Sequence, residues 1–124
     1  MPSPIPILQQ GRFLIASVHS VLDDDDWVRL HGELAHRVAS ARAEGVIIDV
    51  TSADVLDSFA TRMLRSIADI SRLRGARTVI AGIAPDVAFA MVQLGLTLDG
   101  ISTVLDLDSA LAVLNRRTAG GDAG

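Results

Sequence analysis

The segment Val46–Val50 (VIIDV) constrains the fold more than any other, because nearly all of it is apolar and β-branched. Runs of this kind are typical of strands that are covered on both faces of a parallel sheet. A second such strand, Ala76–Ala81 (ARTVIA), follows after a segment with helical periodicity. Alternation of strands and helices with short links predicts an α/β fold with right-handed crossovers.

Hydrophobic periodicity and turn residues place the other elements around these two strands. The predicted order is β-β-α-β-α-β-α-β-α, a mostly parallel mixed sheet with an N-terminal hairpin and four helices. The hairpin joins an edge strand at Ile5–Leu8 to a strand at Arg12–Val18 through a turn at Gln9–Gly11, and a last strand is expected at Thr103–Leu105. Helices are expected at Asp23–Arg42, Ser58–Leu73, Ala84–Leu94 and Asp106–Arg117, and the first three would end at Gly45, Gly75 and Gly95.

One domain accounts for nearly the whole chain. A length of 124 residues, with 49% of them hydrophobic, suffices for a single core. We expect this domain over residues 1–117, with Phe59, Met63, Ile67 and Ile70 as the buried stripe of the second helix. Residues 118–124 (TAGGDAG) have nothing to bury, so the sequence predicts a disordered tail.

The composition narrows the possible chemistry, because the chain contains neither cysteine nor lysine. Disulfides, thiolate catalysis, cysteine-bound metals, P-loops and Schiff bases are thereby excluded, and we expect no cofactor. A formal net charge of −4 argues against binding to nucleic acid or to an anionic membrane. No secretory signal is apparent, and Pro85-Asp86 divides the most apolar region, Thr78–Leu98, so we expect a cytoplasmic protein.

Three loops are expected to meet at one edge of the sheet. They follow the strands that end near Val18, Val50 and Ala81, and all of them leave the sheet at its carboxyl edge. Open α/β sheets place their ligand and partner sites there. The sequence therefore predicts that three segments lie near one another: Asp23-Asp24, Asp57-Ser58 and Gly82–Pro85.

Ser58 lies at the predicted start of a helix, where no preceding turn covers its hydroxyl. A phosphoryl group there would face free N–H groups and the positive end of the helix dipole, with Arg62 one turn away. The position is also typical of an N-cap, which Ser58 or Asp57 would supply. The two interpretations are compatible, because a capping hydroxyl can also accept a phosphoryl group.

Other candidates for chemistry have simpler explanations. Asp23–Asp26 with Asp49 could collect magnesium, but a receiver-like site needs a lysine, and a charged helix start explains the acids better. His19, His31 and His36 lack partners at the spacing that catalysis or metal binding requires. The apolar segment Asp86–Leu94 cannot bury every face against one sheet, so it either lies beneath other elements or docks a partner.

An ordered set of motifs runs through residues 4–116: Ile5–Leu8, Leu22–Asp24, Gly45–Ser52, Asp57–Phe59, Gly75-Ala76, Gly82–Pro85, Leu94–Leu96 and Leu105–Leu111. In this order and spacing the chain resembles the STAS-domain family of anti-sigma-factor antagonists, and within it the RsbS branch of stressosome scaffold proteins. Phe59-Ala60 after the serine match that branch, whereas many STAS antagonists have a small residue followed by glycine.

The resemblance implies the STAS fold and a binding function without catalysis. The unphosphorylated chain would assemble with itself and with RsbR-like STAS paralogues, and would hold an RsbT-like serine kinase. Phosphorylation of Ser58 would release the kinase to activate a general stress sigma-factor pathway, and a PP2C-type phosphatase would reset the serine. The expected surroundings of the phosphoserine are Asp23, Asp24, Asp57, Phe59 and Arg62, and the expected partner-binding residues are Gly82, Pro85 and Phe89.

Two other functions stay open. A STAS-like scaffold could bind its partners constitutively, with Ser58 acting only as a cap. A small enzyme or nucleotide binder of flavodoxin-like architecture would need a phosphate-cradling loop, a lysine or a base, and the sequence shows none of them.

Overall fold

The computed structural model describes residues 5–19, 22–53, 56–93 and 101–123, and for residues 117–123 only the course of the backbone. Within these residues one mixed sheet has the order β1-β2-β3-β4-β5. Its strands are β1 (Ile7–Gln10), β2 (Phe13–Ser17), β3 (Gly45–Asp49), β4 (Arg77–Ala81) and β5 (Ser102–Val104). β1 and β2 form an antiparallel hairpin, and all other neighbours pair in parallel, so the predicted fold class is confirmed.

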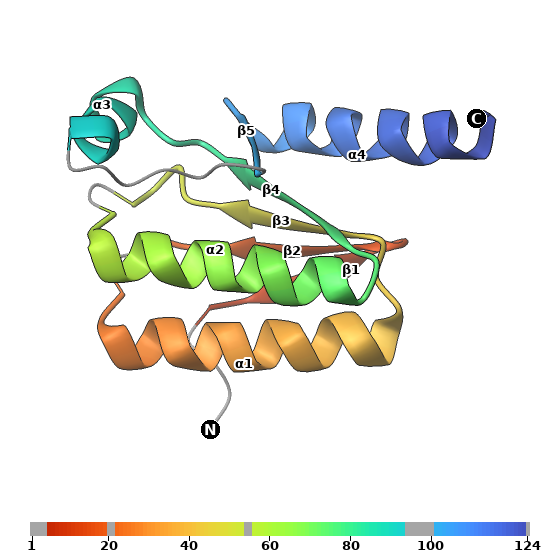
Figure 1. The fold of residues 1–124 in the computed structure, drawn as a ribbon, viewed down its shortest axis with the longest axis horizontal. Helices are drawn as coiled ribbons and strands as arrows, with labels where there is room; N and C mark the ends of the chain where they lie inside the picture. The colour runs from red at the N-terminus through yellow and green to blue at the C-terminus, as the bar shows by residue number, and fades with distance from the viewer. Residues whose placement is uncertain (1–4, 20–21, 54–55, 94–100, 124) are drawn as a thin grey trace.

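Helices cover both faces of the sheet (Figure 1). α1 (Asp24–Ala41) and α2 (Ser58–Leu73) pack against each other on one face, and α4 (Leu107–Ala123) lies on the opposite face against β3, β4 and β5. α3 (Pro85–Gln93) lies beyond the carboxyl end of β4 (Figure 1). The strands that carry helices on both sides are those with the most continuous apolar sequence, as expected for a parallel sheet.

The sheet separates two apolar cores. Val46 and Ile48 of β3 face α1 and α2, where they meet side chains such as Leu30 and Leu64, whereas Ile47 faces α4. All of these side chains are fully buried. Successive residues of a strand point to opposite faces, so a strand between two helical layers needs apolar residues at every position.

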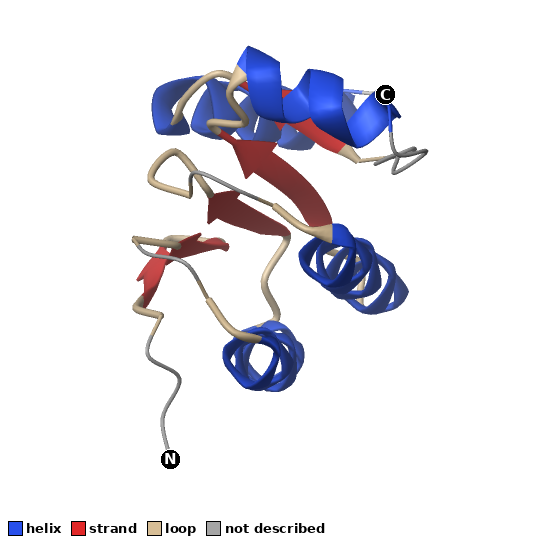
Figure 2. Cartoon of the chain, turned by 90° about the vertical axis from the view of Figure 1, so that its left-hand side faces the viewer, coloured by secondary structure: helices blue, strands red, loops and turns tan. Residues whose placement is uncertain are grey.

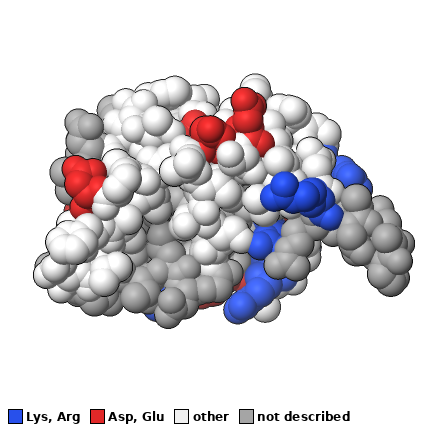
Figure 3. All heavy atoms as spheres, turned by 90° about the horizontal axis from the view of Figure 1, so that it is seen from above, with Lys and Arg blue, Asp and Glu red and all other residues white. Residues whose placement is uncertain are grey.

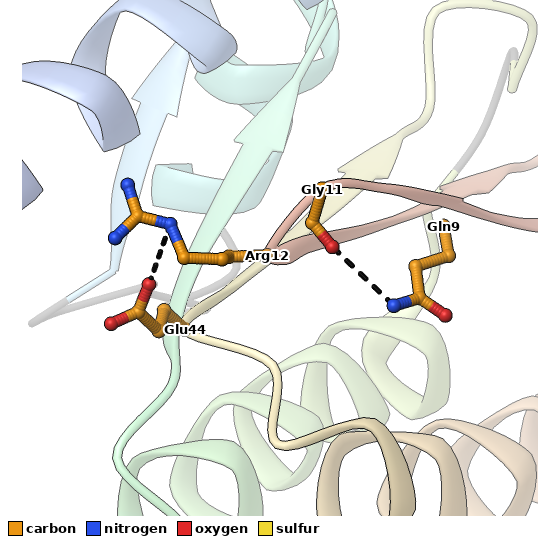
Figure 4. Close-up of polar contacts among 4 residues, drawn as sticks. All are labelled: Gln9, Gly11, Arg12 and Glu44. Atoms are coloured by element: carbon orange, nitrogen blue, oxygen red, sulfur yellow. Dashed lines mark hydrogen bonds and ion pairs between the residues drawn. The ribbon is translucent and has the colours of Figure 1, made fainter.

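The first strand of the N-terminal hairpin lies two residues further along the chain than predicted, whereas β2 lies within its predicted range. β1 pairs Ile7 with Ala16 and Gln10 with Phe13, so Gln9 and Gln10 belong to the strand and not to the turn. The turn is tighter because Gly11 adopts a φ of 59°, which glycine allows without steric cost. Gln9 Nε2 donates to the carbonyl oxygen of Gly11 at 3.3 Å, and Arg12 Nε forms an ion pair with Glu44 Oε2 at 2.9 Å (Figure 4).

The prediction that Gly45 ends the first helix was wrong. The left-handed residue after α1 is Arg42, with a φ of 51°, and Gly45 is the first residue of β3. A Cβ atom at Gly45 would lie 2.7 Å from a methyl group of Leu114 and 2.9 Å from the ring of Phe13. Gly45 therefore allows α4 to approach the sheet closely.

Two further differences concern helix faces and ends. The buried stripe of α2 is centred on Ala60, Leu64 and Ile67, and Phe59 and Met63, predicted to lie on it, are only partly buried at its flank. α4 continues to Ala123 instead of ending at Arg117. The division into a domain over residues 1–117 and a tail over residues 118–124 stays a prediction.

Replacing Thr78 with valine should stabilise the protein by about 1 kcal/mol, because burial of an unpaired hydroxyl is unfavourable. Thr78 is 5% exposed, and its Oγ1 has no hydrogen-bond partner among the described residues. The measurement is the free energy of unfolding from urea titrations. Thr103→Val is the matched control, because Thr103 lies exposed on β5, and its effect should be within a few tenths of a kcal/mol. Equal effects of the two substitutions would contradict the explanation.

Candidate partner-binding site at the carboxyl edge of the sheet

The loops that follow β2, β3 and β4 leave the sheet at the same edge, as predicted (Figure 2). Backbone hydrogen bonds extend the parallel ladder into these loops. Val18 N donates to Asp49 O at 2.8 Å, Val50 N to Ala81 O at 2.9 Å, and Gly82 N to Val104 O at 2.9 Å. The N-termini of α1 and α2 both lie at this edge (Figure 1), so their first turns present free N–H groups on the same side of the molecule.

Ser58 is the first residue of α2, and Asp57 is the N-cap. The Asp57 carboxylate accepts a hydrogen bond from Ala60 N at 2.8 Å, so the cap does not need the serine hydroxyl. Ser58 is exposed, and its hydroxyl makes no hydrogen bond with any residue that the structure describes. The structure thus leaves this hydroxyl open to a second molecule at the positive end of a helix.

Arg62 lies one turn after Ser58 on α2, and residues four apart share a face of a helix. Its side chain is exposed and forms no ion pair with the described part of the chain. By contrast, Arg37 pairs with Glu33 and Arg72 pairs with Asp69 on their own helices. The guanidinium of Arg62 is therefore available to a negative charge added near Ser58.

The acids at this edge stabilise helix starts. Asp23 and Asp26 form a capping box at α1, in which each side chain accepts a hydrogen bond from the other's backbone N–H at 2.8 and 3.2 Å. Asp24 is exposed in the first turn of the same helix.

Asp106 Oδ1 accepts from Ser109 N at 2.8 Å, and the hydrogen bonds from Ser109 lower the pKa of the Asp106 carboxyl. The stability contributed there is complete above the ordinary pKa of aspartate and is lost as the pH falls through the lowered value.

The metal interpretation of the acids receives no support from the described residues. In the part of the chain that the structure describes, no three His, Asp or Glu side chains are placed to hold a metal ion. Asp49 Oδ1 instead accepts from Thr51 N at 2.9 Å and from Thr51 Oγ1 at 2.6 Å, which shapes the β3–α2 loop. His31 Nε2 lies 2.9 Å from Ser66 Oγ and links α1 to α2.

α3 presents apolar side chains to solvent. Pro85 is its first residue, as predicted, and Met91 is buried, but Phe89 and Val92 are 65% and 71% exposed. The sequence left open whether this helix is buried beneath other elements or docks a partner. The structure divides the helix between the two: the side with Met91 is packed, and the side with Phe89 and Val92 is available to a partner. The predicted end at Gly95 lies outside the described residues.

Sequence reasoning missed the contact that joins two of these loops. Gly82 has a φ of 87°, and a Cβ atom there would lie 2.8 Å from both Cα and N of Thr51. The β4–α3 loop therefore packs directly against the β3–α2 loop. The isolated glycine was the only signal for this contact, and it was interpreted as a partner-binding residue; that role stays a prediction.

Replacing Asp57 tests whether its side chain, and not the Ser58 hydroxyl, caps α2. We expect Asp57→Ala to lower the free energy of unfolding by about 1 kcal/mol, because Ala60 N loses its acceptor. Asp57→Asn keeps a side-chain oxygen and should stay within a few tenths of a kcal/mol of the parent. Urea unfolding measures both. An equal loss in the two variants would show that the carboxylate does not act as the cap.

The sequence model of the STAS domain family matches residues 5–110, and the chain belongs to this family. The RsbT co-antagonist protein RsbRC of Bacillus subtilis is 33% identical over 107 residues, which cover 80% of this chain and 38% of the relative. RsbRB of the same organism is 30% identical and is matched over 90% of this chain and 40% of the relative. The chain thus spans about two fifths of the length of these relatives.

Solved structures give the same family. RsbS S58E from Moorella thermoacetica superimposes with a TM-score of 0.84 and 31% identity, covering 94% of this chain and 99% of that one. A chain from a structure of the stressosome, described as a signal integration and transduction hub, has a TM-score of 0.76 and 29% identity, over 91% and 98% of the two chains. Unphosphorylated SpoIIAA, at 11% identity and a TM-score of 0.68 over 91% and 97%, shares the fold. No helix among the described residues is long and apolar enough to span a membrane.

Proposed function

We propose that this STAS protein is a phosphorylation-regulated scaffold of a stressosome. In its unphosphorylated form it assembles with itself and with RsbR-like STAS paralogues, and it holds an RsbT-like serine kinase. Phosphorylation of Ser58 releases that kinase, which then activates the general stress sigma-factor pathway, and a PP2C-type phosphatase resets the serine. The protein acts in the cytoplasm by binding and not by catalysis.

The observation that carries this proposal is that the Ser58 hydroxyl, at the carboxyl edge of the sheet, is not used as a helix cap. It is exposed, Asp57 takes the capping role, and Arg62 follows one turn later without an ion partner among the described residues. Similarity to RsbS and to RsbT co-antagonist proteins supports the choice of partners. The similar Moorella RsbS was solved as a variant with glutamate in place of serine 58, and this chain also has a serine with that number.

The charged groups around Ser58 favour a phosphorylation switch at this site. A phosphoserine adds about −1.5 to −2 charges and three acceptor oxygens. Arg62 and the first N–H groups of α2 can stabilise these oxygens within the domain. Asp23, Asp24 and Asp57 already make the edge acidic, so the added charge repels an acidic surface of a bound partner. Phe89 and Pro85 of α3 supply the apolar part of the partner contact, since Phe89 is 65% exposed.

The test is phosphorylation of the full chain by an RsbT-type kinase with ATP and magnesium. Intact-mass measurement should show one added phosphoryl group, which site mapping places on Ser58. Ser58→Ala should abolish it, whereas Ser52→Ala, which changes an exposed serine of the β3–α2 loop, should retain it. An unmodified parent chain, or a phosphoryl group that persists in Ser58→Ala, would favour a constitutive scaffold.

A further inference from the structure

α3 has apolar residues on two opposite sides. On one side Val87 is partly buried and Met91 is 5% exposed, and both pack against the core. The other side consists of apolar residues that are all exposed: Pro85, Ala88, Phe89 and Val92. Their spacing of i, i+3, i+4 and i+7 places them on one face of the helix. We call this surface the α3 stripe.

The α3 stripe differs from the other exposed apolar residues of the described chain, because its members are neighbours. Phe89 is 65% exposed and Val92 is 71% exposed, and they lie close together on the same helix. The other large hydrophobic side chains that the described part of the chain exposes each lie on a different element or loop: Leu8, Val28, Leu73 and Leu105. Single exposed apolar residues are ordinary, whereas a contiguous apolar surface is typical of a binding site.

Contacts on both sides of the α3 stripe hold the helix against the rest of the fold. Gly82 N donates to Val104 O at 2.9 Å, and the close approach of Gly82 to Thr51 joins the β4–α3 loop to the β3–α2 loop. Ile83 packs against the core before the helix begins, and Met91 packs against it near the end of the helix. A partner therefore meets a preformed surface and does not have to order it, which lowers the cost of association.

Aspartates are the only charged residues in the sequence around the α3 stripe. Between Arg77 and Arg116 there is no lysine, arginine or histidine, and the charged residues are Asp86, Asp99, Asp106 and Asp108. On the face formed by α3, β5 and α4, acidic side chains lie at the α3 end and in the middle, and arginines lie toward the opposite end (Figure 3). The charge next to the α3 stripe therefore favours a basic partner and disfavours an acidic protein surface or an anionic membrane.

We propose that the α3 stripe binds a basic amphipathic helix of the RsbT-type kinase. Apolar side chains at this spacing form ridges that pack into the grooves of a second helix. The apolar face of the kinase helix covers Phe89 and Val92, and its arginines or lysines face Asp86. The proposal rests on the proposed function, in which this kinase is the partner, and adds the chemistry of the contact. Because the phosphoryl group at Ser58 repels an acidic part of the kinase, the α3 stripe contributes affinity in both states and does not itself sense phosphorylation.

The experiment titrates the full chain with the kinase by calorimetry. In a Ser58→Ala background, Phe89→Ala should weaken binding by about 30-fold, as expected for a buried aromatic anchor. Val92→Ala should weaken it by about fivefold, and by the same factor in a Ser58→Glu background. Leu73→Ala is the control, because Leu73 is 81% exposed at the end of α2, and its effect should be within about twofold. Urea unfolding verifies that each variant folds like the parent.

Two further measurements test the chemistry of the partner. Asp86→Arg should weaken binding of the kinase by about tenfold, whereas Asp69→Arg, the same charge change on α2, should stay within a few-fold. Hydrogen exchange of the kinase then locates the segment that the parent chain protects and Phe89→Ala does not. That segment should have apolar residues at helical spacing and a net positive charge.

The outcomes separate this contact from the switch. If Phe89→Ala binds the kinase as tightly as Leu73→Ala does, the contact is overturned, and a difference between Ser58→Ala and Ser58→Glu would still support the switch. If those two Ser58 variants bind equally while Phe89→Ala weakens binding, the switch is wrong and the contact stands. An acidic protected segment, or tighter binding by Asp86→Arg, would overturn the proposed partner chemistry. A kinase that does not bind the parent chain would overturn both proposals.

Discussion

Replacing Ser58 with alanine should keep the RsbT-type kinase bound in the presence of ATP, and replacing it with glutamate should weaken that binding by about 100-fold. The exposed hydroxyl is the acceptor for the proposed phosphoryl group, and its loss removes the release step. A carboxylate at the same place adds a charge to an edge that already holds Asp23, Asp24 and Asp57. The measurement is a titration of each variant with the kinase by calorimetry, with and without ATP.

The control for this prediction is Ser52→Glu. Ser52 is exposed in the β3–α2 loop at the same edge, so the substitution adds the same charge outside the first turn of α2. It should change the affinity for the kinase by only a few-fold. Equal affinities for Ser58→Ala and Ser58→Glu would remove the proposed mechanism, and equal effects of Ser58→Glu and Ser52→Glu would reduce it to general repulsion.

Gly82→Ala should lower the free energy of unfolding by about 3 kcal/mol, a large effect for one methyl group. The φ of 87° disfavours any side chain, and the new Cβ atom would lie 2.8 Å from backbone atoms of Thr51, which cannot move without shifting the β3–α2 loop. Trp27 is the only tryptophan and is 3% exposed, so its fluorescence during urea unfolding measures the change.

Gly32→Ala is the matched control for Gly82→Ala. Gly32 lies within α1, and a Cβ atom there would meet nothing within 4 Å. This substitution should stabilise the protein by about 0.5–1 kcal/mol, because alanine is the better helix former. A loss at Gly82 no larger than 1 kcal/mol would show that the two loops separate easily and that the contact with Thr51 is not tight.

Features with local causes were predictable from the sequence. The bounds of α2 were predicted at both ends, because an N-terminal Asp-Ser pair and the left-handed Gly75 are strong local signals. The central strands were predicted within one residue, because β3 is buried on both faces and therefore apolar throughout. The meeting of three loops at the carboxyl edge followed from strand order alone.

Features with tertiary causes were not predictable. Nothing in the sequence distinguishes Arg42 as the left-handed end of α1, since glycine is the usual residue there and Gly45 lies close by. Gly45 is required instead by the side chains of Leu114 and Phe13, which come from distant parts of the chain. The partial burial of Phe59 likewise depends on how α2 is rotated against the sheet.

The most direct test of the central claim compares the wild-type chain before and after phosphorylation of Ser58. Each form is immobilised, its modification is verified by intact mass, and the amount of RsbT-type kinase retained from solution is measured. The account predicts near-stoichiometric retention by the unphosphorylated chain and retention close to background by the phosphorylated one. Equal retention of the kinase by both forms would contradict it.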